Sequence, residues 1–157
     1  QAVHALEETS KALQSEGWHF NTEYDYPLVP DSVTSRITLP VNTLKVDLDP
    51  EIYTDSDPVQ RGLKLYDRKN HRDTWTKDLK AIITFELEFE ELPEQFRHYI
   101  AVKSARIFAA RFLGSREIEG FALRDEIEAK ARAIESDSEN ADRTIFDNYS
   151  VLRVLDR

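Results

Sequence analysis

The sequence has no cysteine, no methionine and only four glycines among its 157 residues. Without cysteine, the chain has no disulfide framework, no zinc–thiolate site and no thiol nucleophile. The scarcity of glycine argues against a glycine-rich phosphate-binding loop, and no Gly-x-Ser-x-Gly, Walker or GxGxxG pattern is present. No segment approaches the ~18 consecutive apolar residues of a membrane-spanning helix, so we expect no membrane anchor.

Acidic side chains outnumber basic ones by 30 to 21, which gives a net charge of −9. This balance argues against a protein that grips nucleic acid through its phosphates. One segment, residues 93–113, reverses the sign, with four basic side chains and one acidic. The four are Arg97, Lys103, Arg106 and Arg111. On a helix they flank the apolar face, and we expect them to pair with acidic groups within the chain or across a subunit contact.

Apolar residues at helical spacing predict three helices. The first covers residues 2–16 and ends at Gly17, which suits the position just past a last helical turn. The second covers residues 93–113 and carries a wide apolar face. The third covers residues 117–135, and the polar run 136–142 behind it is expected to be a flexible hinge.

Alternation of apolar and polar residues predicts about six short strands between the first two helices. They cover residues 18–26, 35–39, 43–48, 63–66, 74–76 and 80–89. The last strand is the clearest, and it places Glu86, Glu88 and Glu90 together on its polar face. Residues 49–61 are expected to be a mobile connection. Because the strands run together and the helices bracket them, the fold class is α+β, a helical bundle around an inserted antiparallel β-domain.

We divide the chain into four parts. These are a bundle helix (1–17), a β-domain (18–92), two helices that complete the bundle (93–135) and a flexible C-terminal arm (136–157). Seven of the twelve residues 144–155 are apolar, and such a segment should dock on a surface. Its own core is one destination, but we favour a neighbouring copy or a partner. The contact residues would be Ile145, Phe146, Tyr149, Val151 and Leu152.

Residues suited to catalysis or metal binding are few. Glu86 and Glu88 would lie about 7 Å apart on a strand, a separation that would suit an inverting glycosidase. A solvated strand face explains these two glutamates better. The four histidines show no HExxH or i,i+4 spacing, and the acidic runs 55–57 and 137–140 lack the glycine of a calcium loop. We expect no catalytic residue, no cofactor and no metal.

Seven short motifs follow one another in a distinctive order. They are GWHFN (17–21), LVPD (28–31), YDR (66–68), LPEQFRHYI (92–100), KSAR (103–106), RFLG (111–114) and EIEG (117–120). In order and spacing they resemble the tail tubular protein A family, the head-to-tail adaptors of short-tailed phages (podoviruses). The resemblance covers about residues 10–135.

The resemblance implies a structural protein of the virion tail, made in the host cytoplasm. Family members form a ring, usually of twelve copies, that connects the portal protein to the tail nozzle protein (tail tubular protein B). Tail fibres often attach near this ring. By analogy, the apolar arm would contact the portal, and the four basic side chains would pair with acidic groups of the next copy.

The resemblance also implies that double-stranded DNA passes through the ring during ejection without specific binding. An acidic wall would let the duplex slide, because a basic one would hold its phosphates. We therefore assign Glu86, Glu88 and Glu90 to an acidic channel face.

Two other hypotheses stay open. A polysaccharide or cell-wall hydrolase would use Glu86, Glu88 or another carboxylate pair in a cleft lined by Trp18, Trp75 or tyrosines. A monomeric cellular interaction module would have a compact tail and would not self-assemble.

Overall fold

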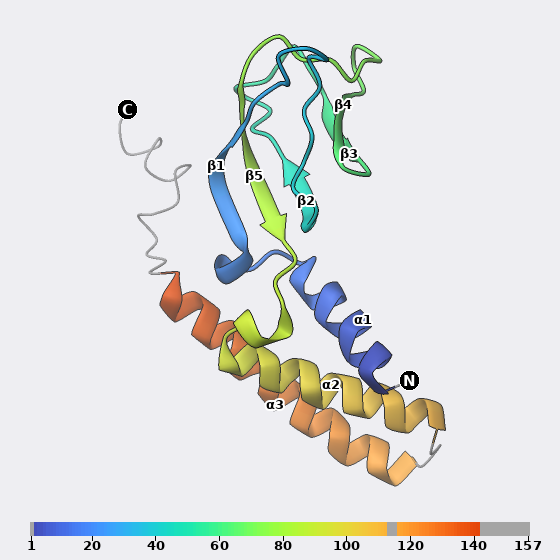
Figure 1. The fold of residues 1–157 in the computed structure, drawn as a ribbon. Coiled ribbons are helices and arrows are strands. Elements are labelled where there is room, and N and C mark those ends of the chain that lie inside the picture. The colour runs from blue at the N-terminus through green and yellow to red at the C-terminus, as the bar shows by residue number, and fades with distance from the viewer. Residues whose placement is uncertain (1, 113–115, 142–157) are drawn as a thin grey trace. The chain divides into compact units, whose positions relative to one another are not determined.

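The computed structural model describes residues 2–112 and 116–141, with residues 112 and 116–122 described through their backbone only. The described residues form two compact units. We call residues 11–88 the β unit, and the residues on either side of them the helical unit. Helix α1 (Ala2–Gln14) contributes residues to both. The class is α+β, as predicted (Figure 1).

The β unit contains two antiparallel sheets. Strand β5 (Leu79–Phe85) is the centre of the larger sheet and pairs with β1 (Thr22–Leu28) on one side and β2 (Thr43–Asp47) on the other. Strands β3 (Pro58–Arg61) and β4 (Lys64–Asp67) form a separate hairpin (Figure 1). Alternate residues of β5 are buried, because this central strand turns its apolar face to the core.

One apolar core holds the β unit together. Its members come from all parts of the unit: Leu28, Ile37, Leu39, Leu48, Leu65, Trp75, Leu79, Ala81, Ile83 and Phe85. Several of them lie in loops rather than in strands, so the core also fixes the irregular segments between β1 and β5. Burial of this apolar surface is the main force that stabilises the unit.

Several predicted strands are wrong in extent. The strand expected at 18–26 begins with a 3₁₀ turn, η1 (His19–Asn21), because the Asn21 side chain accepts a hydrogen bond from the Trp18 amide at 2.8 Å. Segments 35–39 and 74–76 form only isolated bridges. The connection expected at 49–61 already contains β3.

The last strand is shorter than the sequence predicts. It ends at Phe85 instead of residue 89. The buried Gln14 side chain makes two hydrogen bonds to the backbone of Leu87. It accepts one from the Leu87 amide at 2.8 Å and donates the other to the Leu87 carbonyl at 3.0 Å. This reciprocal pair satisfies the backbone groups that a strand would have paired with a neighbouring strand.

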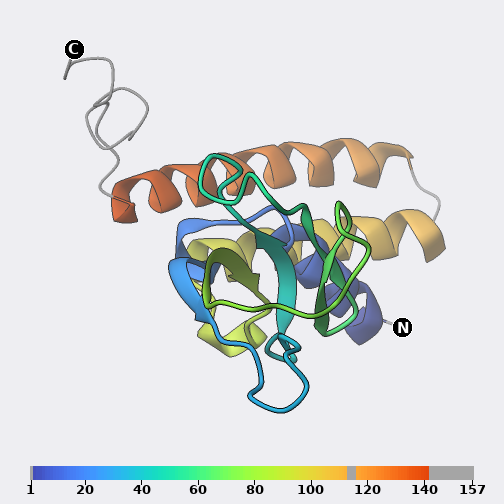
Figure 2. The same ribbon diagram turned by 90° about the horizontal axis from the view of Figure 1, so that it is seen from above.

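The helical unit is built on α2 (Glu94–Phe112) and α3 (Arg116–Asn140), which pack side by side in opposite directions (Figures 1 and 2). A short 3₁₀ turn, η2 (Phe89–Glu91), precedes α2. The buried residues of α2 follow helical spacing: Phe96, Tyr99, Ile100 and Ser104. On α3 the small residues Ala129 and Ala133 are buried.

Helix α3 continues through the predicted hinge. It ends at Asn140. The prediction of a flexible segment that begins at residue 136 is therefore wrong for residues 136–140. Asp137 is buried, and the Ser138 hydroxyl donates to the carbonyl of Ile134 at 3.0 Å. Polar composition alone therefore did not mark the end of this helix.

Candidate functional site

The four basic side chains of α2 all have partners within the helical unit. Arg106 pairs with Glu126 of α3, and both side chains are largely buried, at 22% and 13% exposed. Arg97 pairs with Glu94 one turn earlier, and Arg111 lies 3.7 Å from Glu8 of α1. The side chains were expected to pair with acidic groups either within the chain or across a subunit contact, and these three pairs lie within the chain.

Lys103 has an aromatic partner instead of a carboxylate. Its Nζ lies 5.5 Å from the ring centroid of Tyr99, one turn earlier on α2. A cation at this distance is attracted to the face of the ring. Charge pairing of the α2 cations across a subunit contact stays a prediction.

The three glutamates assigned to a channel face do not share a strand face. Strand β5 ends before Glu86, and Glu90 lies in η2. Glu86 pairs with Lys11 at 3.0 Å, in the part of α1 that belongs to the β unit. The strand geometry that suggested a carboxylate pair at glycosidase spacing is therefore absent.

The apolar residues of the C-terminal segment lie outside the described residues. Helix α3, however, leaves several of its apolar side chains exposed on one face. Its side chains Leu123, Ile127 and Ile134 are 45%, 62% and 44% exposed. At 100° per residue the three fall within about 40° of one another, whereas Ala129 and Ala133 point elsewhere. We call these three residues the α3 stripe, and their spacing of four and seven is the signal that could have identified it.

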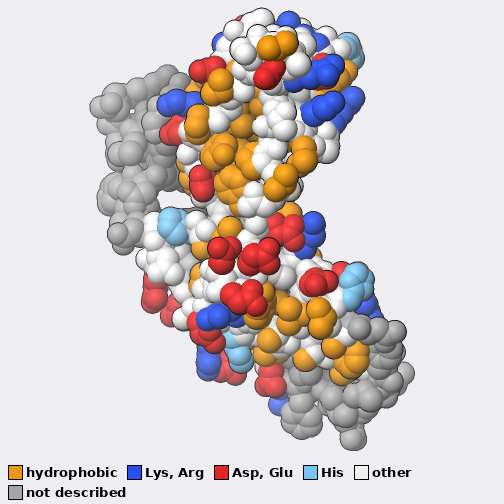
Figure 3. Space-filling model, viewed as in Figure 1, with side chains coloured by type: hydrophobic (Ala, Val, Ile, Leu, Met, Phe, Trp, Pro, Cys, Tyr) orange, Lys and Arg blue, Asp and Glu red, His pale blue; other side chains and the backbone are white. Residues whose placement is uncertain are grey.

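Hydrophobic side chains also gather on the β unit. Figure 3 shows them over the three-stranded sheet on the face in view. Tyr24 of β1 is 65% exposed, and it lies at a β-bulge where Asp25 adopts a left-handed conformation with φ of 54°. Bulges of this kind bend an edge strand and hinder pairing with another chain.

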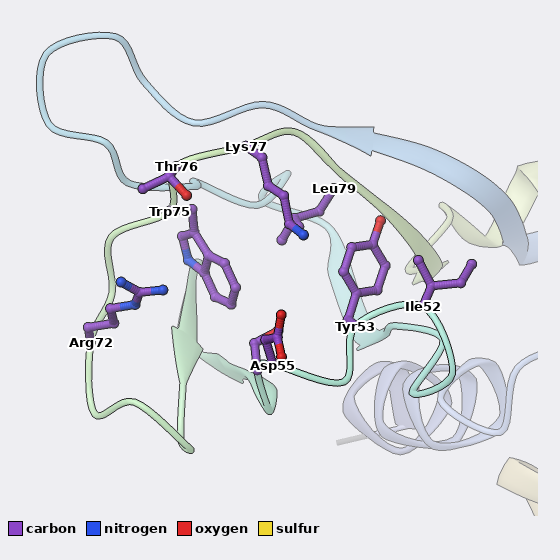
Figure 4. A pocket seen from close by; sticks show the side chains of 9 residues that line it. Ile52, Tyr53, Asp55, Arg72, Trp75, Thr76, Lys77 and Leu79 are labelled. Atoms are coloured by element: carbon purple, nitrogen blue, oxygen red, sulfur yellow. The ribbon is translucent and has the colours of Figure 1, made fainter.

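A pocket of about 210 Å³ opens in the β unit between segments 52–56 and 72–79. The rings of Tyr53 and Trp75 stand on opposite sides of it, and the side chains of Asp55 and Lys77 point into the space between them (Figure 4). Trp75 is held by a hydrogen bond from its Nε1 to the Leu65 carbonyl at 3.1 Å. Trp75 thus belongs to the core of the β unit, and the partly buried Tyr53 packs against that core.

Asp67 supports the rim of this pocket from inside the protein. Its fully buried carboxylate accepts hydrogen bonds from the amides of Asp57, Lys69 and Asn70, and from Asn70 Nδ2 at 2.6 Å. Asn70 also donates to the Asp55 carbonyl at 2.9 Å. Burial raises the pKa of Asp67, but these hydrogen bonds outweigh burial and hold the pKa below its usual range.

The hydrolase hypothesis predicted a cleft lined by Trp18, Trp75 or tyrosines. Trp75 and Tyr53 do line the pocket, whereas Trp18 is not among its lining residues. Asp55 is the one carboxylate among the lining residues, and glycoside hydrolysis ordinarily uses two. The pocket therefore has aromatic lining residues, as the hydrolase hypothesis predicted, but it lacks the second carboxylate.

A family model for tail tubular proteins, Tube, matches residues 1–143. The chain belongs to the tail tubular protein family. No curated protein matches it. Tail tubular proteins are structural components of the phage virion tail rather than enzymes, and they assemble with other tail proteins. The match extends past both ends of the region in which the sequence motifs occur.

The described part of this tail tubular protein offers no obvious metal site. Within residues 2–112 and 116–141, no group of three or more His, Asp or Glu side chains is arranged to hold a metal ion. Among the helices that the structure describes, none has the length and apolar character needed to cross a membrane.

Proposed function

We propose that this tail tubular protein is the repeating subunit of the head-to-tail adaptor ring of a short-tailed phage. The ring joins the portal to the tail nozzle and encloses part of the DNA conduit. Family membership supports a tail component, and the ordered motifs between residues 17 and 120 support the adaptor class. The observation that carries the ring is the α3 stripe, an exposed apolar face on an assembling protein.

In a closed ring, each copy uses two different surface patches. The first patch of one copy contacts the second patch of the next copy. The α3 stripe is a better first patch than the α2 cations, because those cations already have partners in their own chain. Burial of three large apolar side chains gives the association its driving force. The next copy in the ring is the occupant that we assign to the stripe.

The charge of the chain suits a conduit. Each copy carries a net charge of −9, so a ring of them repels the phosphates of a passing duplex. Glu86, Glu88 and Glu90 are candidates for the channel surface, presented by a loop and η2 instead of a strand. The apolar side chains between residues 145 and 152 are the candidate contact with the portal. The ring would contain twelve copies, and tail fibres would attach near it.

Replacement of a stripe residue tests the ring directly. We expect Ile127→Glu to convert the purified ring to monomers of 18.2 kDa, because it would bury a carboxylate in an apolar contact. The matched control is Arg132→Gln, which makes the same change in net charge at an exposed position on another face of α3. Native mass spectrometry gives the masses, and circular dichroism checks that both variants fold.

Two results would contradict the proposal. A ring that forms equally well with Ile127→Glu would show that the stripe is not the contact. A wild-type protein that remains at 18.2 kDa with purified portal present would refute the ring itself.

A further inference from the structure

The β unit carries its charges unevenly. Residues 11–51, which include β1, contain seven acidic and three basic side chains, whereas residues 61–77 contain six basic and two acidic ones. Strand β1 is one edge of the three-stranded sheet, and the β3–β4 hairpin lies beyond the other edge, where Gln60 Nε2 donates to the Thr43 carbonyl at 3.3 Å. The strand and the hairpin therefore lie on opposite sides of the β unit (Figures 1 and 2).

The end of the β3–β4 hairpin holds two cations close together. Arg61 and Lys64 are direct partners across the hairpin, and like charges in that position destabilise a strand pair. The Arg61 guanidinium lies 3.6 Å from the ring centroid of Tyr66, but within the part of the chain that the structure describes neither cation has a carboxylate partner. Leu63, in the turn between them, is exposed. We call Arg61, Leu63 and Lys64 the basic hairpin, and an acidic partner would relieve its repulsion.

Strand β1 carries the opposite charge around a similar apolar centre. Tyr24 is largely exposed, and its neighbours Glu23 and Asp25 are exposed carboxylates. Among the described residues Glu23 has no ion-pair partner, and Asp25 pairs with Lys80 at 3.8 Å. The β-bulge here hinders backbone pairing with another strand, so a partner would contact the side chains. We call Glu23, Tyr24 and Asp25 the acidic edge.

The acidic edge and the basic hairpin complement each other. Each has one exposed apolar side chain between two charges of one sign, and the two signs are opposite. A contact between them would bury the apolar centres and leave the charges at its rim, where they select the partner and its orientation. Strands β5 and β2 separate the two surfaces within one chain, so they can meet only between copies. Two different surfaces on opposite sides are what the head-to-tail contact of a closed ring requires.

We infer that the β units of neighbouring copies dock on one another, with the acidic edge of one copy against the basic hairpin of the next. The inference rests on the proposed ring and adds a contact that lies wholly within the β unit. Nucleic acid is a poorer occupant of the basic hairpin, because it would leave the acidic edge without a partner and would be repelled by the net charge of −9.

Zero-length cross-linking of the assembled wild-type protein tests the contact. A carbodiimide condenses a carboxylate with a lysine amine, with loss of water, where the two groups touch. We expect a link between Glu23 and Lys64 in peptides analysed by mass spectrometry. Rings assembled from an equal mixture of isotopically labelled and unlabelled copies should give this link with mixed labels, because it joins two copies. The link between Asp25 and Lys80 of one chain, which never mixes labels, is the positive control for the reaction.

Charge reversal measures how much the contact contributes to assembly. Glu23→Lys and Lys64→Glu should each raise the protein concentration at half-assembly about tenfold, because each replaces an attraction by a repulsion. The double variant should return to within about threefold of wild type, because the signs are then exchanged rather than lost. The matched control is Lys45→Glu at an exposed position of β2, which makes the same change in net charge as Lys64→Glu and should leave assembly unchanged.

The outcomes separate this inference from the ring itself. A ring that gives the Asp25–Lys80 link but no Glu23–Lys64 link would overturn the docking of the β units and leave the ring intact. A double variant that assembles no better than the single variants would do the same. Wild-type protein that stays at 18.2 kDa with portal present would overturn both. Retention of duplex DNA by the wild-type ring, lost in Lys64→Glu, would assign the basic hairpin to nucleic acid and overturn the inference alone.

Discussion

Asn21 links three segments of the β unit, and its replacement should be costly. The side chain is 2% exposed. Its Nδ2 donates to the carbonyls of Gln14 and Phe85, both at 2.9 Å, and its Oδ1 accepts from the Trp18 amide at 2.8 Å. Asn21→Ala would leave these three backbone groups without their partner in a place that water reaches poorly. At about 1 kcal/mol for each group, we expect a loss of about 3 kcal/mol in the free energy of unfolding.

Urea denaturation at one protein concentration measures this loss. The fluorescence of Trp18 and Trp75 reports on the β unit, because both tryptophans lie within it. The matched control is Asn42→Ala, since the exposed side chain of Asn42 makes one hydrogen bond, from its Nδ2 to the Glu86 carbonyl at 3.2 Å, and the backbone bond of this residue would remain. We expect that control to lose about 0.5 kcal/mol or less. Equal losses in the two variants would refute the argument, because the burial of the Asn21 contacts would then contribute nothing.

Two further predictions concern charged side chains. Asp67→Asn should cost about 2 kcal/mol at neutral pH, because an amide cannot accept the hydrogen bond from Asn70 Nδ2 at the same oxygen. The pKa of Asp67 is lowered on folding, so its stabilisation is present above the unfolded pKa of about 3.9 and is lost as the pH falls through the folded pKa. Urea titrations from pH 7 to pH 3 should therefore show wild type and variant converging in acid, and a constant difference would contradict this. A double-mutant cycle on Arg106 and Glu126 should give a coupling of about 1.5 kcal/mol, against at most about 0.5 for the exposed Arg132–Glu128 pair. Similar couplings would show that burial adds nothing to the first pair.

The sequence predicted elements well where one periodic pattern was sufficient. Helices α1 and α2 were expected within two residues of their observed ends, because their apolar residues recur at helical spacing. The central strand β5 was recognisable for the same reason, at a period of two. Such patterns are local, so a single sequence reveals them.

The errors arose where a side chain distant in sequence replaces a regular hydrogen-bond partner. Asn21, whose Nδ2 donates to the carbonyl of Phe85 far along the chain, initiates a 3₁₀ turn at a place where alternation predicted a strand. Gln14, which is 73 residues away from Leu87, ends β5 by binding its backbone. Neither pairing follows from composition or periodicity, because both depend on the tertiary fold that they help to stabilise.

The candidate sites were harder to predict than the fold. The basic residues of α2 were visible as a charge reversal, but the sequence could not show that Glu126 approaches Arg106 from another helix. Asp67 looked like part of a polar turn, yet its carboxylate is fully buried. The pocket brings together two segments about twenty residues apart, so Tyr53 and Trp75 gave no joint signal in the sequence.

We propose that this tail tubular protein forms a ring between portal and nozzle, and electron cryo-microscopy of the native phage particle would show whether it does. We expect a closed ring of this chain seated on the portal, with the α3 stripe of each copy covered by the next copy. The proposal is wrong if the chain occurs in the particle as isolated copies, or if the α3 stripe faces solvent in an assembled tail.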